Sequence, residues 1–381
     1  MIAPICRHAG CTTSNVPALS TVSPGVREHL ARLFPGYHVE RVEPLAPDSG
    51  ATKDSTTKSI GYGAPVRITL ADDHGQTRRV VWRVSSSNEF GHDRRADRAA
   101  QALLAFDDFA AIPHHIAALD VGAIGPGGEL ISLRDAGELY LVTSYAEGGV
   151  YAEDLRRIAS DGAATELDRA RVDALATFLA ALHTPIDAPL RYRRAIRDLV
   201  GDGEGIFGIL DGYPPEVPGV SPARLQAIEA RCVDWRWRLR GHEGRLTRTH
   251  GDFHPFNVVF DHGAQFTCLD ASRGACGDPA DDVTAMSINY LLFALDRPAT
   301  WKRGLGPLWH RFWASYRGAR ADPSLYAVVP PFFAWRALVV SNPRFYPGLS
   351  APARGALLGL AESALAANHF DPDWADELFD G

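Results

Sequence analysis

Residues 249–260 read THGDFHPFNVVF, a polar, turn-rich segment that runs directly into apolar residues. Thirteen residues after Asn257 comes Asp270, again at a point where apolar residues give way to an acid. Residues 261–263, Asp-His-Gly, are typical of a tight turn, so the segment predicts two short strands joined as a hairpin. That hairpin would bring Asn257 and Asp270 side by side, with Asp252 on the loop just before the first strand.

This arrangement has the donor chemistry that phosphoryl transfer requires. Carboxylate and amide oxygens are the ligands that Mg²⁺ prefers, and water and phosphate complete its shell. A second carboxylate remains free to meet a hydroxyl group. Protein kinases place an Asp and an Asn five residues apart in their catalytic loop, followed by a metal-binding Asp further on. Asp252 and Asn257 have that spacing of five, and Asp270 follows across the hairpin.

At these residues the chain resembles the aminoglycoside phosphotransferase and choline kinase-like family. The resemblance lies in four short segments: residues 250–257 (HGDFHPFN), 269–270 (LD), 277–279 (GDP) and 182–183 (LH). It extends over roughly residues 40–300, although only the 250–282 stretch is specific. The resemblance implies an α+β, bilobed protein-kinase-like fold, with a small β-rich N-lobe that contains one helix and a larger, mainly helical C-lobe.

The resemblance also implies an activity and the residues for it. The expected enzyme is an ATP-dependent phosphotransferase with an alcohol group as acceptor. It transfers the γ-phosphate of ATP, or of GTP, to a hydroxyl of a small molecule such as an aminoglycoside or other antibiotic, an amino alcohol or a sugar. Asp252 is the expected catalytic base or orienting residue, and Asn257 and Asp270 are the expected Mg²⁺ ligands.

Three further residues are expected to support the catalytic loop. By the resemblance, His250 and His254 hold the loop in shape rather than take part in the chemistry. Asp278 either braces the loop through hydrogen bonds or caps the N-terminus of a helix. Arg273, just past Asp270, faces either a phosphate or anionic substrate, or a salt-bridge partner within its own lobe.

The N-lobe departs from the family pattern. Arg83 occupies the place of the family's phosphate-pairing lysine, and Asp97 takes the place of its partner acid, which is usually Glu. Arg is not equivalent to Lys, because it forks where Lys is a point charge; Arg83 as a plain surface residue is the alternative. Two of the three lysines, Lys53 and Lys58, fall in one short stretch. We expect Lys58 to contact the nucleotide phosphates, with a solvated loop as the alternative.

The hinge between the lobes is expected within residues 141–148, LVTSYAEG. Its backbone at Thr143, Tyr145 and Ala146 would pair with the adenine edge. The alternative is an ordinary strand ending in a turn.

Three regions follow from this organisation. Residues 1–36 form an N-terminal extension with one helix, beginning at Ser23-Pro24. Residues 37–147 form the nucleotide-binding N-lobe, which includes a hairpin around residues 72–75. Residues 148–381 form the helical C-lobe, which contains the catalytic loop (249–282) and the acceptor-binding helices. Helical periodicity predicts helices at residues 93–109, 172–183, 222–239, 283–295, 307–316 and 353–367, and strands are plausible at 130–133 and 139–145.

Composition limits the possible partners and location. The formal charge of −7 argues against a nucleic-acid-binding surface, which would be basic. The longest apolar run, residues 326–340, is interrupted by Pro330, Pro331 and Arg336, so no membrane span is expected. The start of the chain does not resemble a signal peptide, and five cysteines suit a reducing compartment. We expect a cytoplasmic protein that is a monomer or a homodimer.

Two other functions remain open. His250, Asp252 and His254 alternate, so on a strand they would share one face and could hold the metal of a metal-dependent hydrolase. The departures in the N-lobe are also compatible with a non-catalytic nucleotide-binding, kinase-like module. The intact set of Asp252, Asn257 and Asp270 argues against that module, because a protein that only binds nucleotide has no need of a base.

Overall fold

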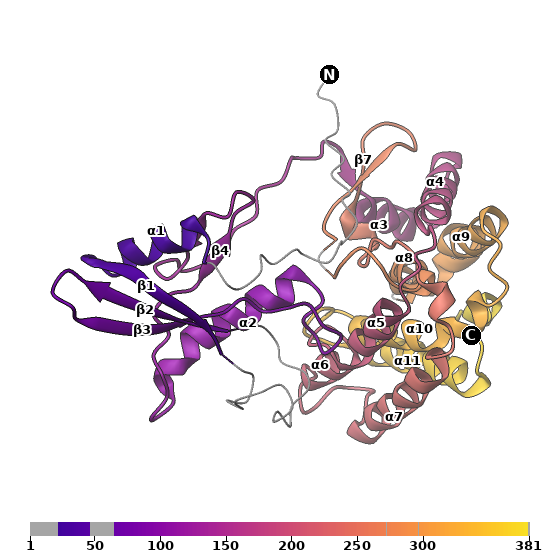
Figure 1. Cartoon of the computed structure of the whole chain (residues 1–381). Coiled ribbons are helices and arrows are strands. Elements are labelled where there is room, and N and C mark those ends of the chain that lie inside the picture. The colour runs from indigo at the N-terminus through magenta and orange to yellow at the C-terminus, as the bar shows by residue number, and fades with distance from the viewer. Residues whose placement is uncertain (1–21, 46–64, 272, 296, 380–381) are drawn as a thin grey trace. The chain divides into compact units, whose positions relative to one another are not determined.

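The computed structural model describes residues 22–45, 65–271, 273–295 and 297–379. The chain divides into two compact units, Met1–Val142 and Thr143–Gly381, whose elements are labelled in Figure 1. The predicted fold class is confirmed, because a small unit built on strands is followed by a larger, mainly helical unit.

An antiparallel sheet forms the centre of the first unit. Its order is β1(Tyr37–Pro44)-β2(Val66–Asp72)-β3(Thr77–Trp82). The predicted hairpin around residues 72–75 joins β2 to β3, with Ile68 opposite Val80. Residue 83 falls just beyond the end of β3.

Helix α1 (Pro24–Leu33) packs against this sheet (Figure 1). The Ser23 hydroxyl caps the helix by accepting a hydrogen bond from the backbone N–H of Val26 at 3.4 Å, and Pro24 occupies the first helical position. Leu30 and Phe34 are buried together with Ile68 of β2. The helix that we assigned to an N-terminal extension is therefore part of the hydrophobic core of the first unit.

The rest of the first unit is less regular. It contains α2 (Arg95–Asp108), a 3₁₀ turn (Phe109–Ala111) and a two-stranded ribbon of β4 (Gly122–Ile124) and β5 (Leu130–Ser132). No strand forms over residues 139–145, although their apolar residues predicted one. A strand needs a neighbouring strand for its backbone hydrogen bonds, and this segment pairs with none in the described part of the chain.

Helices make up most of the second unit. Those predicted at residues 172–183, 222–239, 283–295, 307–316 and 353–367 are all present as longer or equal elements. The α-helices are α3 (Tyr151–Asp161), α4 (Glu166–Leu182), α5 (Pro189–Gly201), α6 (Ile206–Asp211), α7 (Pro222–Leu239), α8 (Pro279–Leu295), α9 (Gly306–Ala319), α10 (Leu325–Ser341) and α11 (Ala351–Ala367). Shorter 3₁₀ and π turns lie at Glu243–Arg245, Pro255–Asn257, Pro298–Thr300, Trp301–Leu305 and Pro372–Leu378.

Helix α10 forms despite two internal prolines, which is why the sequence did not predict it. Proline removes a backbone N–H and so leaves the carbonyl four residues earlier without its helical partner. The carbonyl of Tyr326, four residues before Pro330, instead accepts a hydrogen bond from the N–H of Phe370 at 2.8 Å. α10 is buried almost throughout and packs against α8 and α11 (Figure 1). None of the described helices is long and apolar enough to cross a membrane.

A small sheet carries the catalytic loop of the second unit. β7 (Val258–Phe260) pairs with β8 (Phe266–Cys268) as the predicted hairpin, with Val258 opposite Cys268. On its other side β7 pairs with the short β6 (Gly149–Val150). Val258 and Phe260 are fully or almost fully buried in the main core. The C-terminal end of the loop that precedes β7 is therefore fixed in position.

Candidate active site

The loop before β7 is tied to the segment that precedes α8. Thr247 and Gly277 exchange both backbone hydrogen bonds, at 2.9 and 3.0 Å. Gly251 has φ of +85°, and a Cβ there would lie 2.8 Å from the carbonyl oxygen of Gly274. Only glycine adopts this left-handed conformation at little cost and also tolerates the close approach. The glycine in HGD is therefore required by the local backbone.

Asp282, in the first turn of α8, holds this loop through its backbone. Its two carboxylate oxygens accept hydrogen bonds from the N–H groups of His250 at 2.7 Å and Gly251 at 2.8 Å. The buried ring of His183, at the end of α4, lies 3.2 Å from the same carboxylate, and its other nitrogen lies 2.7 Å from the Tyr316 hydroxyl. Burial alone would raise the pKa of Asp282, but His183 and the two amides lower it below its ordinary value.

The side chains predicted to support the loop do lie within it. Nδ1 of His250 accepts a hydrogen bond from the N–H of Asp252 at 3.3 Å, and Nδ1 of His254 accepts one from the N–H of Phe256 at 3.2 Å. Nε2 of His254 lies 3.3 Å from Oδ2 of Asp252. Within the described residues, no group of three or more His, Cys, Asp or Glu side chains is arranged to hold a metal ion. These contacts differ from the arrangement that the hydrolase alternative needs.

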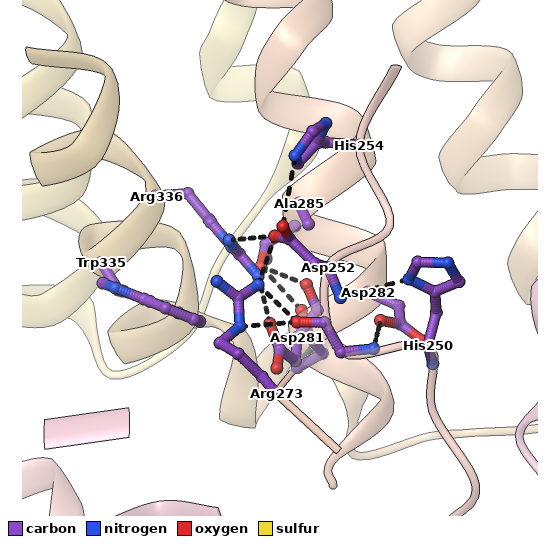
Figure 2. Close-up of polar contacts among 12 residues, drawn as sticks. His250, Asp252, His254, Arg273, Asp281, Asp282, Ala285, Trp335 and Arg336 are labelled. Carbon is purple, nitrogen blue, oxygen red and sulfur yellow. Dashed lines mark hydrogen bonds and ion pairs between the residues drawn. The ribbon is translucent and has the colours of Figure 1, made fainter. Parts of the chain in front are cut away.

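Two guanidinium groups converge on Asp252 (Figure 2). Arg273 donates to Oδ1 of Asp252, and its Nε also donates to the carbonyl oxygen of Gly251 at 2.7 Å. Arg336, from α10, places Nη1 3.5 Å from the same Oδ1 and donates from Nη2 to Asp281 at 2.5 Å. Asp252 is therefore fixed by charged groups that come from outside residues 250–257.

These neighbours keep Asp252 ionised. Burial alone would raise the pKa of its carboxyl, since the charged form loses solvation. The hydrogen bond with His254 and the charges of Arg273 and Arg336 outweigh that effect and hold the pKa well below its usual range. Asp252 therefore presents a carboxylate, not a carboxylic acid, throughout the neutral pH range.

Asp270 lies in a different environment. Its side chain is exposed, its φ is +29°, and its carboxylate has no hydrogen bond or ion pair among the described residues. The N–H of the preceding Leu269 donates to the backbone oxygen of Asn257 at 2.8 Å, which ties the two segments together. A non-glycine residue with positive φ is uncommon and costs energy, and such residues cluster at functional sites.

Asn257 and Asp270 offer oxygen donors that fit Mg²⁺. The side-chain N–H₂ of Asn257 donates to the backbone oxygen of Asp252 at 3.1 Å, which leaves the amide oxygen as an acceptor. The carboxylate of Asp270 makes no hydrogen bond or ion pair within the described part of the chain, so its oxygens are available to a cation. Hard cations such as Mg²⁺ select oxygen ligands of this kind.

Asp278 lies at the start of α8 but away from the loop backbone. One oxygen accepts from the N–H of Ala280 at 2.9 Å, which is a helix-capping contact. Its carboxylate also accepts from both Nε (2.8 Å) and Nη2 (3.0 Å) of Arg245, and from the hydroxyl of Tyr192 at 2.9 Å. Direct contact with the catalytic loop is made instead by Asp282, four residues later.

The predicted nucleotide residues of the first unit have other neighbours. The guanidinium of Arg83 lies 6.0 Å from the ring centroid of Phe109. Asp97 accepts a hydrogen bond from the N–H of Arg94 at 2.8 Å and so caps α2. Their mutual pairing stays a prediction, as does the role of Lys58, which lies outside the described residues.

The predicted hinge residues belong to the start of the second unit. Thr143, Tyr145 and Ala146 lie in a segment without helix or strand that leads into β6. Their pairing with adenine stays a prediction.

Sequence reasoning underestimated the residues that surround Asp252. Asp281 and Asp282, which lie just after the Gly-Asp-Pro segment, were not among the residues predicted to support the loop. Arg336 was noted only as a charge that interrupts an apolar run. The signal for Arg336 was nevertheless present, because an arginine within an otherwise apolar segment is almost never buried without a partner.

A family model and several solved structures are similar to this chain. A model of the phosphotransferase enzyme family matches residues 70–320. Among solved structures, a glucosamine kinase is 15% identical, with 93% of this chain and 100% of that chain covered and a TM-score of 0.41. A choline/ethanolamine kinase family protein from Mesorhizobium loti is 15% identical (74% and 82% covered, TM-score 0.37). The macrolide 2'-phosphotransferase MphH from Brachybacterium faecium is also 15% identical (93% and 97% covered, TM-score 0.30). The comparison with curated proteins gave no match.

Proposed function

The chain belongs to the phosphotransferase enzyme family, and we propose that it is a kinase that transfers the γ-phosphate of ATP or GTP to a hydroxyl group of a small molecule. The observation that carries this proposal is the fixed, ionised carboxylate of Asp252. It lies five residues before Asn257 and in the same loop, with the exposed carboxylate of Asp270 beyond the hairpin. The acceptor class that we propose is an aminoglycoside or other antibiotic, an amino alcohol or a sugar.

In the proposed reaction the acceptor oxygen forms a bond to the γ-phosphorus. The bond from that phosphorus to the β,γ-bridging oxygen breaks, and the electron pair leaves with the nucleoside diphosphate. Asp252 accepts a hydrogen bond from the acceptor hydroxyl, and this contact orients a lone pair of the hydroxyl oxygen toward the γ-phosphorus. Because its pKa is held so low, Asp252 takes the proton only as the new bond forms, so its main contribution is orientation.

The metal is proposed to bind at Asn257 and Asp270. When bound, Mg²⁺ neutralises charge on the phosphate oxygens. On the nucleotide side we propose Arg83, Asp97 and Lys58 for the phosphates, and the backbone at residues 143–146 for the base. These assignments rest on the family resemblance.

A thermal-shift titration tests the proposed nucleotide site. ATP and GTP are each added with Mg²⁺ and, separately, with EDTA. A ligand at 100 times its dissociation constant stabilises the folded state by roughly 2.7 kcal/mol, which is easily measured as a rise in Tm. We expect a rise that depends on Mg²⁺, followed by release of the nucleoside diphosphate when the correct hydroxyl compound is supplied. No rise with either nucleotide would contradict the proposal, and stabilisation by zinc or manganese alone would favour the hydrolase alternative.

A further inference from the structure

A buried arginine from α10 reaches the catalytic carboxylate. Arg336 is only 5% exposed, although it lies in a helix whose other residues are almost all apolar. A buried guanidinium loses much of its hydration, so it is retained only where the protein supplies partners. The partners of Arg336 therefore show what it is used for.

Arg336 has two carboxylate partners and an aromatic support. Nη2 donates to Oδ1 of Asp281 at 2.5 Å, and Nη1 lies 3.5 Å from Oδ1 of Asp252. The guanidinium carbon lies 3.9 Å from the ring centroid of Trp335. The indole is itself fixed, because its Nε1 donates to the backbone oxygen of Glu204 at 2.9 Å. The guanidinium is thus held in one orientation between a ring and two acids (Figure 2).

Adjacent residues of α8 hold the catalytic loop at two different places. Asp282 accepts hydrogen bonds from the loop backbone at His250 and Gly251. Asp281 holds Arg336, which in turn faces the loop side chain Asp252. Asp282 therefore fixes the position of the loop backbone. Asp281 fixes, through Arg336, the orientation of the Asp252 carboxylate.

We propose that Arg336 is a positioning residue for phosphoryl transfer: from α10, it holds the Asp252 carboxylate in the orientation that receives the acceptor hydroxyl. This rests on the proposed function. Arg273 contacts the same oxygen but also binds the carbonyl oxygen of Gly251, so part of its role is to support the loop backbone. Within residues 250–257, the described contact of Arg336 is with the side chain of Asp252.

Nε of Arg336 is buried and has no hydrogen-bond partner among the described residues. Replacing Arg336 alone leaves the largely buried carboxylate of Asp281 without its charged partner, so a loss of stability accompanies any effect on kcat.

Replacing Arg336 by Met tests the proposal, because Met keeps an unbranched chain against Trp335 but removes the charge. Release of nucleoside diphosphate is measured with ATP·Mg²⁺, first with water as acceptor and then with any hydroxyl compound that a panel identifies. We expect Arg336→Met to lower kcat about 100-fold, the size of effect that follows a small misplacement of reacting groups. KM for ATP should not change, since the described hydrogen bonds and ion pairs of Arg336 include neither Asn257 nor Asp270. Arg336→Lys, which keeps the charge but cannot fork between two acids, should recover part of kcat.

Arg354 of α11 provides a matched control. It is 4% exposed and also has a buried Nε without a described partner, but its described hydrogen bonds go to the backbone oxygens of Tyr346 and Pro347. Arg354→Met should lower Tm without lowering kcat.

An unchanged kcat in Arg336→Met would overturn the inference. If that variant does not fold, the pair Asp281→Asn with Arg336→Met removes both charges together and is measured in its place. Asp252→Asn separates the two proposals. Activity that persists in Asp252→Asn contradicts the proposed function, whereas activity lost there but kept in Arg336→Met contradicts only the role of Arg336.

Discussion

Asp252 is predicted to orient the acceptor hydroxyl and Asp270 to bind the metal in the same reaction, yet the two carboxylates are held in opposite ways. Asp252 is 18% exposed, contacts two arginines, His254 and Asn257, and sits in a loop whose backbone is bonded to a buried aspartate. Asp270 is exposed, has a φ of +29° and makes no side-chain hydrogen bond or ion pair among the described residues.

The difference matches the two proposed tasks. A residue that orients a hydroxyl must be fixed to within a fraction of an ångström, so its surroundings supply partners for it. A residue that binds a cation must keep its oxygen lone pairs available until the cation arrives, so partners within the protein would compete with the metal. The predictions below test whether this contrast is functional.

The largest effect is expected from Asp252→Asn. Asn keeps the shape of the side chain but removes the negative charge that receives the hydroxyl proton and balances Arg273 and Arg336. We expect kcat to fall about 1,000-fold, within the range known for loss of a positioned general base. KM for the nucleotide should stay close to that of the unmodified enzyme. Steady-state release of nucleoside diphosphate measures both quantities.

Asp261→Asn is the matched control for Asp252→Asn. Asp261 lies in the turn between β7 and β8, where its side chain is 56% exposed. An equal fall in kcat in both variants would mean that the effect comes from the hairpin and not from the carboxylate at the loop.

The next effect concerns the residue that holds the loop. In Asp282→Asn the amide oxygen can still accept a hydrogen bond from one of the two N–H groups, those of His250 and Gly251. The amide N–H₂ then faces the other N–H, so two donors oppose each other. His183 also loses its carboxylate partner. We expect the free energy of unfolding to fall by about 3 kcal/mol, the upper end of the cost of leaving a buried donor without its partner. Chemical denaturation of Asp282→Asn and of Asp234→Asn, an exposed site on α7, measures this difference.

The pH dependence of that difference has a definite sign. The pKa of Asp282 is lowered in the folded state, so its carboxylate stabilises the fold above the unfolded pKa of about 4. The stabilisation is lost as pH falls through the lower, folded pKa. The gap in stability between the unmodified enzyme and Asp282→Asn should therefore be constant at neutral pH and narrow below about pH 4. A gap that widened in acid would show that the carboxylate is not stabilised by its neighbours.

The catalytic loop could be predicted from the sequence because the residues that define it lie close together along the chain. The spacing from Asp252 to Asn257 and the turn at Asp261 are enough to indicate the hairpin, and the structure contains it. The same is true of α7, whose predicted ends at Pro222 and Leu239 agree with the structure, because a serine cap and a proline mark its start.

The surroundings of Asp252 could not be predicted in this way. Arg336 reaches the loop only because α10 continues through Pro330 and Pro331, and local rules argue against a helix there. One carbonyl that the prolines leave without a helical partner, that of Tyr326, is satisfied by the N–H of Phe370, more than forty residues later in the chain. Contacts of this range depend on the packing of α8, α10 and α11, which no local pattern encodes.

The smallest change in stability is expected from Asp270→Asn, and it completes the contrast with Asp252. The side chain is exposed and has no described partner to lose, and Asn tolerates positive φ at least as well as Asp. We therefore expect the free energy of unfolding to stay within about 0.5 kcal/mol of the unmodified enzyme, as for an ordinary surface substitution. The Mg²⁺-dependent rise in Tm with ATP should nevertheless be lost, because the metal loses its charged ligand. Asp252→Asn, measured beside it, should show the reverse: a lower Tm without ligand and a rise with ATP·Mg²⁺ that persists. A retained Mg²⁺-dependent rise in Asp270→Asn would mean that the exposed, positive-φ carboxylate is not kept free for a metal.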